Sequence, residues 1–364
     1  MTKIKRLFFF PEAPNNFNGY GIAVSEDLKK FVFSDSDLIV FYTDKLKGDI
    51  EKYIKLPGQV VVIKRNKNLM KLFKSRFRIL NPGRFWDNEV LNTVSNNEIE
   101  YIFCGDTIFY EFIHLFFADK SSKIAIRFHN NWHKIKSRIR LLKVKVNLKF
   151  YITNLLIDIR TERKAFLNRK ADKYFISTSD LAYYRLITGN RDGQVWGVTE
   201  FSDAEVSGLG AADKNISNSF DVAANALRHK RFIWFGTVVA HSVDGVNRFI
   251  SDIFKPLQSE YPSLEFHLYG YGTEAFNSTV NNIYAHGIYK GDSLPMKNEG
   301  LYILPDLTGG GIKLKVNSFI VNEVCFLSTP FGVEGYSIDK LSRIADVVEF
   351  DLWEEHLKAK LRNS

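Results

Sequence analysis

Residues 231–270 read RFIWFGTVVAHSVDGVNRFISDIFKPLQSEYPSLEFHLYG, and this segment decides the fold class. An apolar run opens it at 231–236 and another closes it at 264–270. Between them, residues 242–261 have the spacing of a helix with one apolar face, formed by Val246, Phe249, Ile250, Ile253 and Phe254. A connection of this length joins parallel strands, so the segment predicts a strand–helix–strand unit.

The same alternation extends over the whole chain and predicts an α/β protein. Strands are expected at 4–10, 37–43, 59–64, 99–105, 123–128 and 172–177, and again at 231–236, 264–270, 282–287, 300–305, 324–329 and 346–350. We therefore predict two tandem Rossmann-like domains that face each other across a cleft. Their expected bounds are 1–200 for an N-terminal acceptor-binding domain, 201–228 for a linker of small polar residues, 229–350 for a C-terminal nucleotide-sugar-binding domain, and 351–364 for a last helix packing back toward the N-terminal domain.

Composition favours a globular protein of the cytoplasm. A chain of 364 residues with 45% hydrophobic content can bury two cores. The apolar start ends at Pro11 and Glu12, too early for a signal peptide, and no stretch supplies 18 uncharged apolar residues. The only cysteines, Cys104 and Cys325, are expected to be buried thiols.

The net charge of +9 is concentrated in residues 120–170, which hold fifteen Lys or Arg against Asp158 and Glu162. Apolar residues are interleaved in KIKSRIRLLKVKVNLKFYI (134–152), a composition that favours contact with anionic lipid headgroups. A solvated face and a nucleic-acid surface are the alternatives, although we expect no nucleic acid as a partner. The basic residues proposed for a membrane or acceptor face are Lys134, Lys136, Arg138 and Arg140.

Several common sites are disfavoured by spacing. Gly19 and Gly21 follow the first strand without the third glycine of a dinucleotide fingerprint, and GGGIKLK lacks the last residues of a P-loop. His129 and His133 have zinc-compatible spacing but no adjacent Glu. The sequence therefore predicts no metal and no cofactor.

The segment TGGGIKLK, residues 308–315, favours an anion site. Its glycines allow close approach of the backbone, the first amides of the following helix point outward, and a lysine adds positive charge. Gly310, Gly311, Lys313 and Lys315 are the candidates to hold a diphosphate. The alternative is a plain turn with its lysines in solvent.

These pieces together resemble the GT-B glycosyltransferases, in particular those grouped with glycosyltransferase family 4. The resemblance rests on FIWFGTVVAHSVDGVNRFISDIFKPL, LEFHLYGYGTE, NIYAHGIYKG, and GGGIKLK followed by STPFGVEGY in the second half. In the first half, AIRFHNNW followed by ERKAFLNRKADKYFISTSD is similar to the acceptor-domain pattern. The family's usual Glu is replaced by Ser318, and its small Gly and Pro by Glu323 and Cys325.

The resemblance implies roles for particular residues. His129, with Arg127 and Asn130, would be catalytic, with the histidine positioning the sugar and the attacking hydroxyl; Gly19 and Gly21 would form a loop close to the donor. The implied donor-binding residues are Gly236, Thr237, Gly270, Gly272, Gly310, Gly311, Lys313, Lys315, Ser318 and Glu334.

The implied activity is transfer of a hexosyl or deoxyhexosyl group from a nucleoside-diphosphate sugar to a saccharide, with retention and without a metal. Family habit and the basic face suggest a lipid-linked acceptor in bacterial O-antigen or capsule synthesis, reached by peripheral contact with an anionic membrane. A GT-B epimerase, an inactive sugar-nucleotide-binding relative and a nucleic-acid-binding protein are the alternatives.

Overall fold

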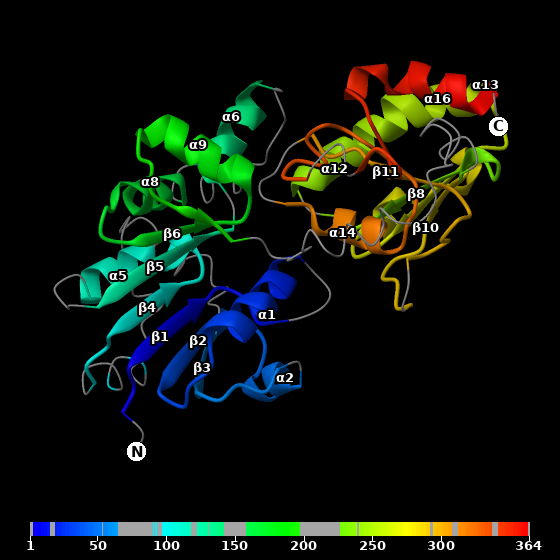
Figure 1. The fold of residues 1–364 in the computed structure, drawn as a ribbon. Helices are drawn as coiled ribbons and strands as arrows, with labels where there is room; N and C mark the ends of the chain where they lie inside the picture. Colours follow the sequence, from blue (N-terminus) through cyan, green and yellow to red (C-terminus); the bar gives the residue numbers. More distant parts are fainter. Residues whose placement is uncertain are drawn as a thin grey trace, which may run out of the picture. The chain divides into compact units, whose positions relative to one another are not determined.

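The computed structural model describes residues 3–14, 19–52, 54–64, 90, 92, 97–117, 122–129, 131–141, 158–196, 226–238, 240–291, 294–307, 312–336 and 341–362. Its contacts divide the chain into two compact units. The first comprises residues 1–137 and 146–200, and the second comprises 138–145 and 201–364. Each unit is built on its own parallel sheet (Figure 1).

The sheet of the first unit has the order β3-β2-β1-β4-β5-β6-β7, with every neighbouring pair parallel. From β1 to β3 the strands are added toward one edge of the sheet, and from β4 to β7 they are added toward the other edge. The reversal point therefore lies between β1 and β4, which are direct neighbours. The strands are β1 (Arg6–Phe10), β2 (Asp37–Thr43), β3 (Gln59–Lys64), β4 (Tyr101–Cys104), β5 (Lys123–Phe128), β6 (Asp172–Phe175) and β7 (Gln194–Val195).

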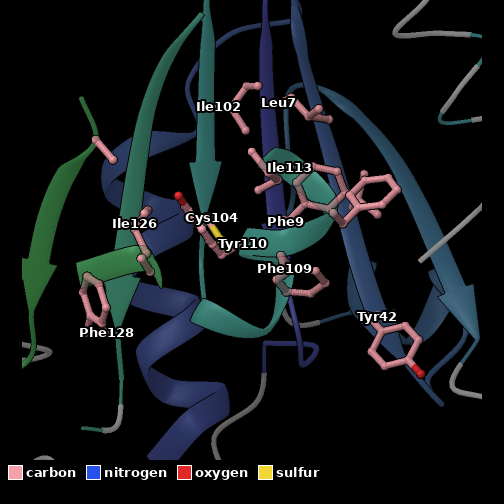
Figure 2. Packing of buried hydrophobic residues seen from close by; sticks show 14 of the residues in the cluster. Leu7, Phe9, Tyr42, Ile102, Cys104, Phe109, Tyr110, Ile113, Ile126 and Phe128 are labelled. Carbon is pink, nitrogen blue, oxygen red and sulfur yellow. The ribbon is translucent and has the colours of Figure 1, made fainter. Parts of the chain in front are cut away.

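Alternate side chains of these strands enter two cores, one on each face of the sheet. Phe8 and Phe10 pack with residues of α1, whereas Phe9 packs with residues of α5, α8 and α9. Figure 2 shows Cys104 and Phe128 in the second of these cores. The helices are α1 (Gly19–Phe31), α2 (Lys47–Glu51), the 3-10 turn η2 (Thr107–Phe109), α5 (Tyr110–Phe117), α6 (Trp132–Leu141), α8 (Ile159–Leu167) and α9 (Thr178–Thr188).

The second sheet repeats this plan with the order β10-β9-β8-β11-β12-β13, again with parallel neighbours. Its reversal lies between β8 and β11. The strands are β8 (Arg231–Phe235), β9 (Glu265–Tyr269), β10 (Ile283–Ala285), β11 (Leu301–Leu304), β12 (Phe326–Ser328) and β13 (Ala345–Val347).

The helix predicted from the opening segment forms as α12 (Ala240–Arg248), a π-helical stretch η4 (Phe249–Phe254) and α13 (Lys255–Glu260). Its apolar residues enter one core with Trp234, while α14 and Ile233 belong to the core on the other face. The remaining helical elements are η5 (Thr273–Phe276), η6 (Thr279–Asn281), α14 (Leu314–Val321), η7 (Phe350–Leu352) and α16 (Trp353–Arg362).

The twelve predicted strands are all present, with ends shifted by a few residues at most. Strand β7 was missed because its two residues, Gln194 and Val195, are both exposed and show no apolar run. Most of the predicted linker lies outside the described residues. Its last part already belongs to the second unit, because Leu227 is fully buried in that core.

The last helix contributes to the core of the second unit through its buried residues Trp353, Leu357 and Leu361. That it also packs back toward the N-terminal domain stays a prediction. Among the described residues, no helix is long and apolar enough to cross a membrane.

Candidate active site

The reversal point of the second sheet brings a glycine turn and a charged pair together. Gly236 follows β8, and Asp306 follows the neighbouring strand β11 after one intervening proline. In open parallel sheets, ligands bind beyond the carboxyl ends of strands at this point. The carboxyl ends of β8 and β11 are therefore the candidate ligand site of the second unit.

Lys315 lies at the centre of this region. Its Nζ is 2.9 Å from the Asp306 carboxylate and 5.3 Å from the centre of the Trp234 ring. A β-carbon placed on Gly236 would be 3.7 Å from the same Nζ, so the lysine lies against the glycine turn. The predicted neighbours Gly236 and Lys315 are thus brought together, and Asp306 holds the lysine in place.

Lys313 adds a second cation, which lies over the ring of Phe331 with 4.4 Å from Nζ to the ring centre. Burial lowers the pKa of Lys313 to about 8, with Lys315 lowering it further and Asp306 and Glu334 opposing the shift. Its charge is therefore present below pH 8 and is lost as the pH rises above that value. Diphosphate would favour the charged form.

Two predicted donor-binding glycines have a steric role. Gly270 has φ +131°, and a β-carbon on it would lie 1.6 Å from the carbonyl oxygen of Gly236. Gly272 has φ +82° and is the N-cap residue of η5. Because L-residues rarely adopt such φ values, glycine at these positions lets the turns after β8 and β9 pack backbone to backbone.

Other predicted donor residues are placed around this turn or fall outside the structure. Thr237 follows Gly236 directly, and Ser318 is half-buried on α14, where its carbonyl accepts from Asn322. Glu334 makes a bidentate pair with Arg138, which groups with the second unit, at 2.7 Å for both bonds. Gly310 and Gly311 lie outside the described residues.

In the first unit, the carboxyl end of β5 carries a buried charge cluster. Ile126 and Phe128 face the core with α5, so Arg127 faces the opposite core, toward α1. Its Nε lies 3.6 Å from Asp27 Oδ2 on α1, and the same oxygen lies 3.7 Å from His129 Nε2. Side-chain exposure is 0% for Arg127, 1% for Asp27 and 2% for His129.

Burial controls protonation in this cluster. It raises the pKa of Asp27 to about 6, against the opposing effect of Arg127. It lowers the pKa of His129 well below its usual value, and Arg127 acts in the same direction. A ring nitrogen of His129 also bonds to the backbone of Gly105, which follows β4. His129 is therefore neutral at neutral pH and enclosed within its unit.

The segment that resembles the acceptor-domain pattern has a structural function at helix starts. Glu162 accepts from the backbone amides of Trp132 and His133 at 2.8 and 3.0 Å, which caps α6, and it contacts His133 Nδ1 at 2.6 Å. Ser177 caps α9 by accepting from the amide of Asp180. Asn130 lies outside the described residues, whereas Gly19 begins α1 and Gly21 lies in its first turn.

The prediction of a single basic face is corrected by α6. Residues four apart share a helix face, so Lys134 and Arg138 lie on one side and Lys136 and Arg140 on another. Lys134 is buried, with its Nζ 2.7 Å from Ser179 Oγ and 3.1 Å from Asp180 Oδ1. Arg138 is paired with Glu334. Among the four, Arg140 is exposed, and Lys136 and Arg138 are half-buried.

No group of three or more His, Cys, Asp or Glu in the described part of the chain is arranged to hold a metal ion. Asp27 and Asp306 are the site residues that sequence reasoning missed. Asp27 lies within a helix and Asp306 after a strand, and neither belongs to a recognisable motif. Their one signal is an opposing charge, Arg127 or Lys315, which only the fold brings near.

The sequence matches no protein-family model and no curated protein. The structure is similar to that of HepE from Anabaena in complex with UDP and glucose, at 13% identity and a TM-score of 0.56, covering 98% of this chain and 89% of that one.

Two further solved structures agree. WaaG, a glycosyltransferase involved in lipopolysaccharide biosynthesis, has 12% identity and a TM-score of 0.53 over 98% of this chain and 90% of its own. OtsA without ligand has 12% identity and a TM-score of 0.56 over 99% of this chain and 92% of its own. These similarities, together with the two parallel sheets that each have a central reversal point, show that the protein has the GT-B fold, formed by two tandem Rossmann-like units.

Proposed function

We propose that the protein is a glycosyltransferase that moves a sugar from a nucleoside-diphosphate sugar to a saccharide acceptor. One observation carries the proposal: Lys315, paired with Asp306, lies against the Gly236 turn at the reversal point of the second sheet. There, a cation beside closely approaching backbone suits a diphosphate leaving group. The GT-B fold supports this choice, because HepE was solved with UDP and WaaG is described as a glycosyltransferase.

In this proposal, the second unit binds the donor. Lys313 and Lys315 would neutralise charge that develops on the departing diphosphate, and Gly236 and Thr237 would let it approach the backbone. Preorganised positive charge of this kind is usually the largest contribution to catalysis. The transferred group would be a hexose or deoxyhexose, moved with retention and without a metal ion.

For the acceptor, we propose a lipid-linked saccharide of bacterial surface polysaccharide, O-antigen or capsule. WaaG acts in lipopolysaccharide biosynthesis, which supports this class. Peripheral contact with an anionic membrane would involve Arg140 and Lys136, because their side chains are at least partly exposed whereas that of Lys134 is buried. Replacing both by Glu should reduce recovery on liposomes that contain an anionic lipid at moderate salt, and unchanged recovery would argue against membrane contact.

The donor site is tested first by ligand binding. Thermal shift is measured with UDP, GDP, dTDP and CMP and with their common sugar conjugates. We expect one nucleotide to raise the melting temperature, and Lys313→Ala and Lys315→Ala to reduce that rise. Lys358→Ala is the matched control, because Lys358 makes surface ion pairs with Glu260 and Glu354 on a different part of the same unit.

Transfer is then assayed with the donor that binds. Sugar released to water or to an added saccharide is detected by NMR, which also reports the anomeric configuration of the product. The same assay with and without a chelator tests metal independence. If no nucleotide binds at millimolar concentration and no donor is consumed, the proposed function is wrong.

A second candidate is an inactive or epimerase-type GT-B protein, and Ser318 favours it. The GT-B family that this chain resembles usually has a Glu at this point of α14, and a serine hydroxyl cannot supply its carboxylate. This candidate predicts donor binding without sugar transfer. Restoring the acid by Ser318→Glu would then be expected to create or increase transfer.

A further inference from the structure

Among its described residues, the first unit contains two Asp–Arg pairs with a buried acid, at opposite ends of its sheet. Arg6 and Asp37 lie at the amino ends of β1 and β2, where Asp37 accepts from Arg6 Nε and Nη2 at 2.6 and 2.7 Å. Arg127 is the next-to-last residue of β5, at the carboxyl end, and its partner Asp27 comes from α1. The two pairs have the same chemistry, but only the Asp27–Arg127 pair lies at the carboxyl ends of the strands, where ligands bind in open parallel sheets.

The two pairs also differ in how the acid is held. Both oxygens of Asp37 bond to Arg6, and one of them also accepts from the amides of Phe33 and Ser34. This is a fully engaged structural pair. Asp27 instead places one oxygen between two groups, at 3.6 Å from Arg127 Nε and 3.7 Å from His129 Nε2.

Position links Asp27 to the strand ends that bind ligands in this class of fold. His129 is the first residue after β5 and bonds to the backbone of Gly105, the first residue after β4. Helix α1, which carries Asp27, starts directly after the loop that follows β1. Asp27 therefore joins α1 to the end of β5, and His129 joins that end to the segment after β4.

We propose that Asp27 is a positioning residue of the transfer reaction, which orients His129 and Arg127 at the carboxyl end of β5. The inference rests on the proposed glycosyltransferase function. Asp27 need not touch the substrate, because its carboxylate acts on the two side chains beside it. Misplacing a catalytic constellation by about 1 Å can lower a rate by about 10²-fold, so loss of this carboxylate should lower kcat more than it changes KM for the donor.

The ionisation of Asp27 gives the proposal a distinct signature. Burial raises the pKa of Asp27 to about 6; the neighbouring charged groups are Arg127, which lowers it, Glu26, which raises it, and Lys30, which lowers it, with His129 also facing the carboxylate. Below about pH 6 the carboxyl is protonated and its hold on Arg127 is lost. The rate of the wild-type protein should therefore fall as the pH decreases through 6.

The test compares Asp27→Asn with Asp37→Asn, which removes the carboxylate charge from the structural pair. Initial rates with the bound donor are measured from pH 5 to 8, together with melting temperatures. For Asp27→Asn we expect kcat to fall by about 10²-fold, with KM for the donor within about threefold and no acid limb near pH 6. For Asp37→Asn we expect a lower melting temperature, with kcat and the acid limb unchanged.

Asp27→Glu provides a second variant if Asp27→Asn does not fold. Because it keeps a titrating carboxylate, its acid limb should remain but move to another pH. A wild-type protein that transfers sugar with no acid limb near pH 6, an Asp27→Asn profile identical to that of Asp37→Asn, or an unshifted limb in Asp27→Glu would overturn the proposal for Asp27 while the transferase function stands. Absence of donor binding and transfer in the wild type overturns the transferase function, and the role of Asp27 in it.

Discussion

Buried charges in this protein are held by specific partners, and the partners show what each charge does. Lys134 was expected on a basic surface, but it is enclosed with Asp180 and Ser179, where a lone ammonium would be costly. Lys315 is held by Asp306 at a strand end where a ligand can bind. The same residue type thus has a structural role in α6 and a candidate binding role in α14.

Glu323 adopts a backbone conformation that favours glycine, and this should lower the stability of the protein. It follows α14 with φ +53°, and the amides of Glu323 and Val324 bond to the carbonyls of Ile320 and Phe319. This is the Schellman helix end, where glycine is preferred at the left-handed position. Because a side chain in that conformation costs about 1 kcal/mol, Glu323→Gly should raise the free energy of unfolding by about that amount.

Urea denaturation measures this change. Ala359→Gly, at an exposed position inside α16, is the control and should lower stability by about 1 kcal/mol, because glycine there weakens a helix. Equal effects of the two substitutions would contradict the assignment of Glu323 to a strained helix end.

Lys313 makes donor binding depend on pH. Burial lowers the pKa of its ammonium to about 8, with Asp306, Lys315, Glu334 and Arg138 as the charged neighbours. If the charged form binds diphosphate, affinity should fall by about tenfold between pH 7 and pH 9 as the proton is lost. Calorimetric titration with the nucleotide that binds would show this fall, and Lys313→Met should bind more weakly with little pH dependence.

At the scale of elements, close packing of helices on strand ends builds the second unit. Helix α12 approaches β11 so closely that a β-carbon on Gly245 would lie 2.0 Å from the carbonyl oxygen of Pro305. The turns after β8 and β9 pack equally closely, because a β-carbon on Gly270 would lie 1.6 Å from the carbonyl oxygen of Gly236. These contacts fix the position of the Gly236 turn relative to Asp306.

Gly245→Ala should therefore lower the stability of the protein, although alanine favours a helix. Moving α12 to accommodate one methyl group is an overpacking change that typically costs about 1–3 kcal/mol. Gly48→Ala in α2 is the matched control, because nothing lies within 4 Å of its added β-carbon. That substitution should stabilise by about 0.5–1 kcal/mol. Opposite signs in thermal or urea denaturation support the close approach, and two stabilising changes would exclude it.

At the scale of the whole molecule, the two units have separate sheets and separate cores. A ligand that binds only the second unit stabilises that unit by about 2.7 kcal/mol at a concentration 100 times its Kd. Hydrogen exchange should therefore slow in β8 and β11 when the nucleotide binds, with β2 and β3 unchanged. Equal protection of both sheets would show that the donor is not held by the second unit alone.

Much of the fold could be predicted from local patterns. Every predicted strand formed because short apolar runs separated by amphipathic stretches suit a parallel sheet covered on both faces. Gly236 and Lys315 could also be selected as neighbours, because the resemblance to the GT-B glycosyltransferases implies that both bind the donor. What was missed lacked such a pattern, as with the exposed strand β7 and the acids Asp27 and Asp306.

The sequence by itself determined the two α/β units, their strands and the lysines placed after the glycine run, because these depend on the spacing of apolar and glycine residues along the chain. Only the tertiary structure decided that Asp27 faces Arg127 and His129, that Lys134 is buried, and that α16 packs on the second core. The physical reason is that the partner of a buried charge or an apolar face is chosen by packing across elements far apart in sequence, which spacing along the chain does not specify.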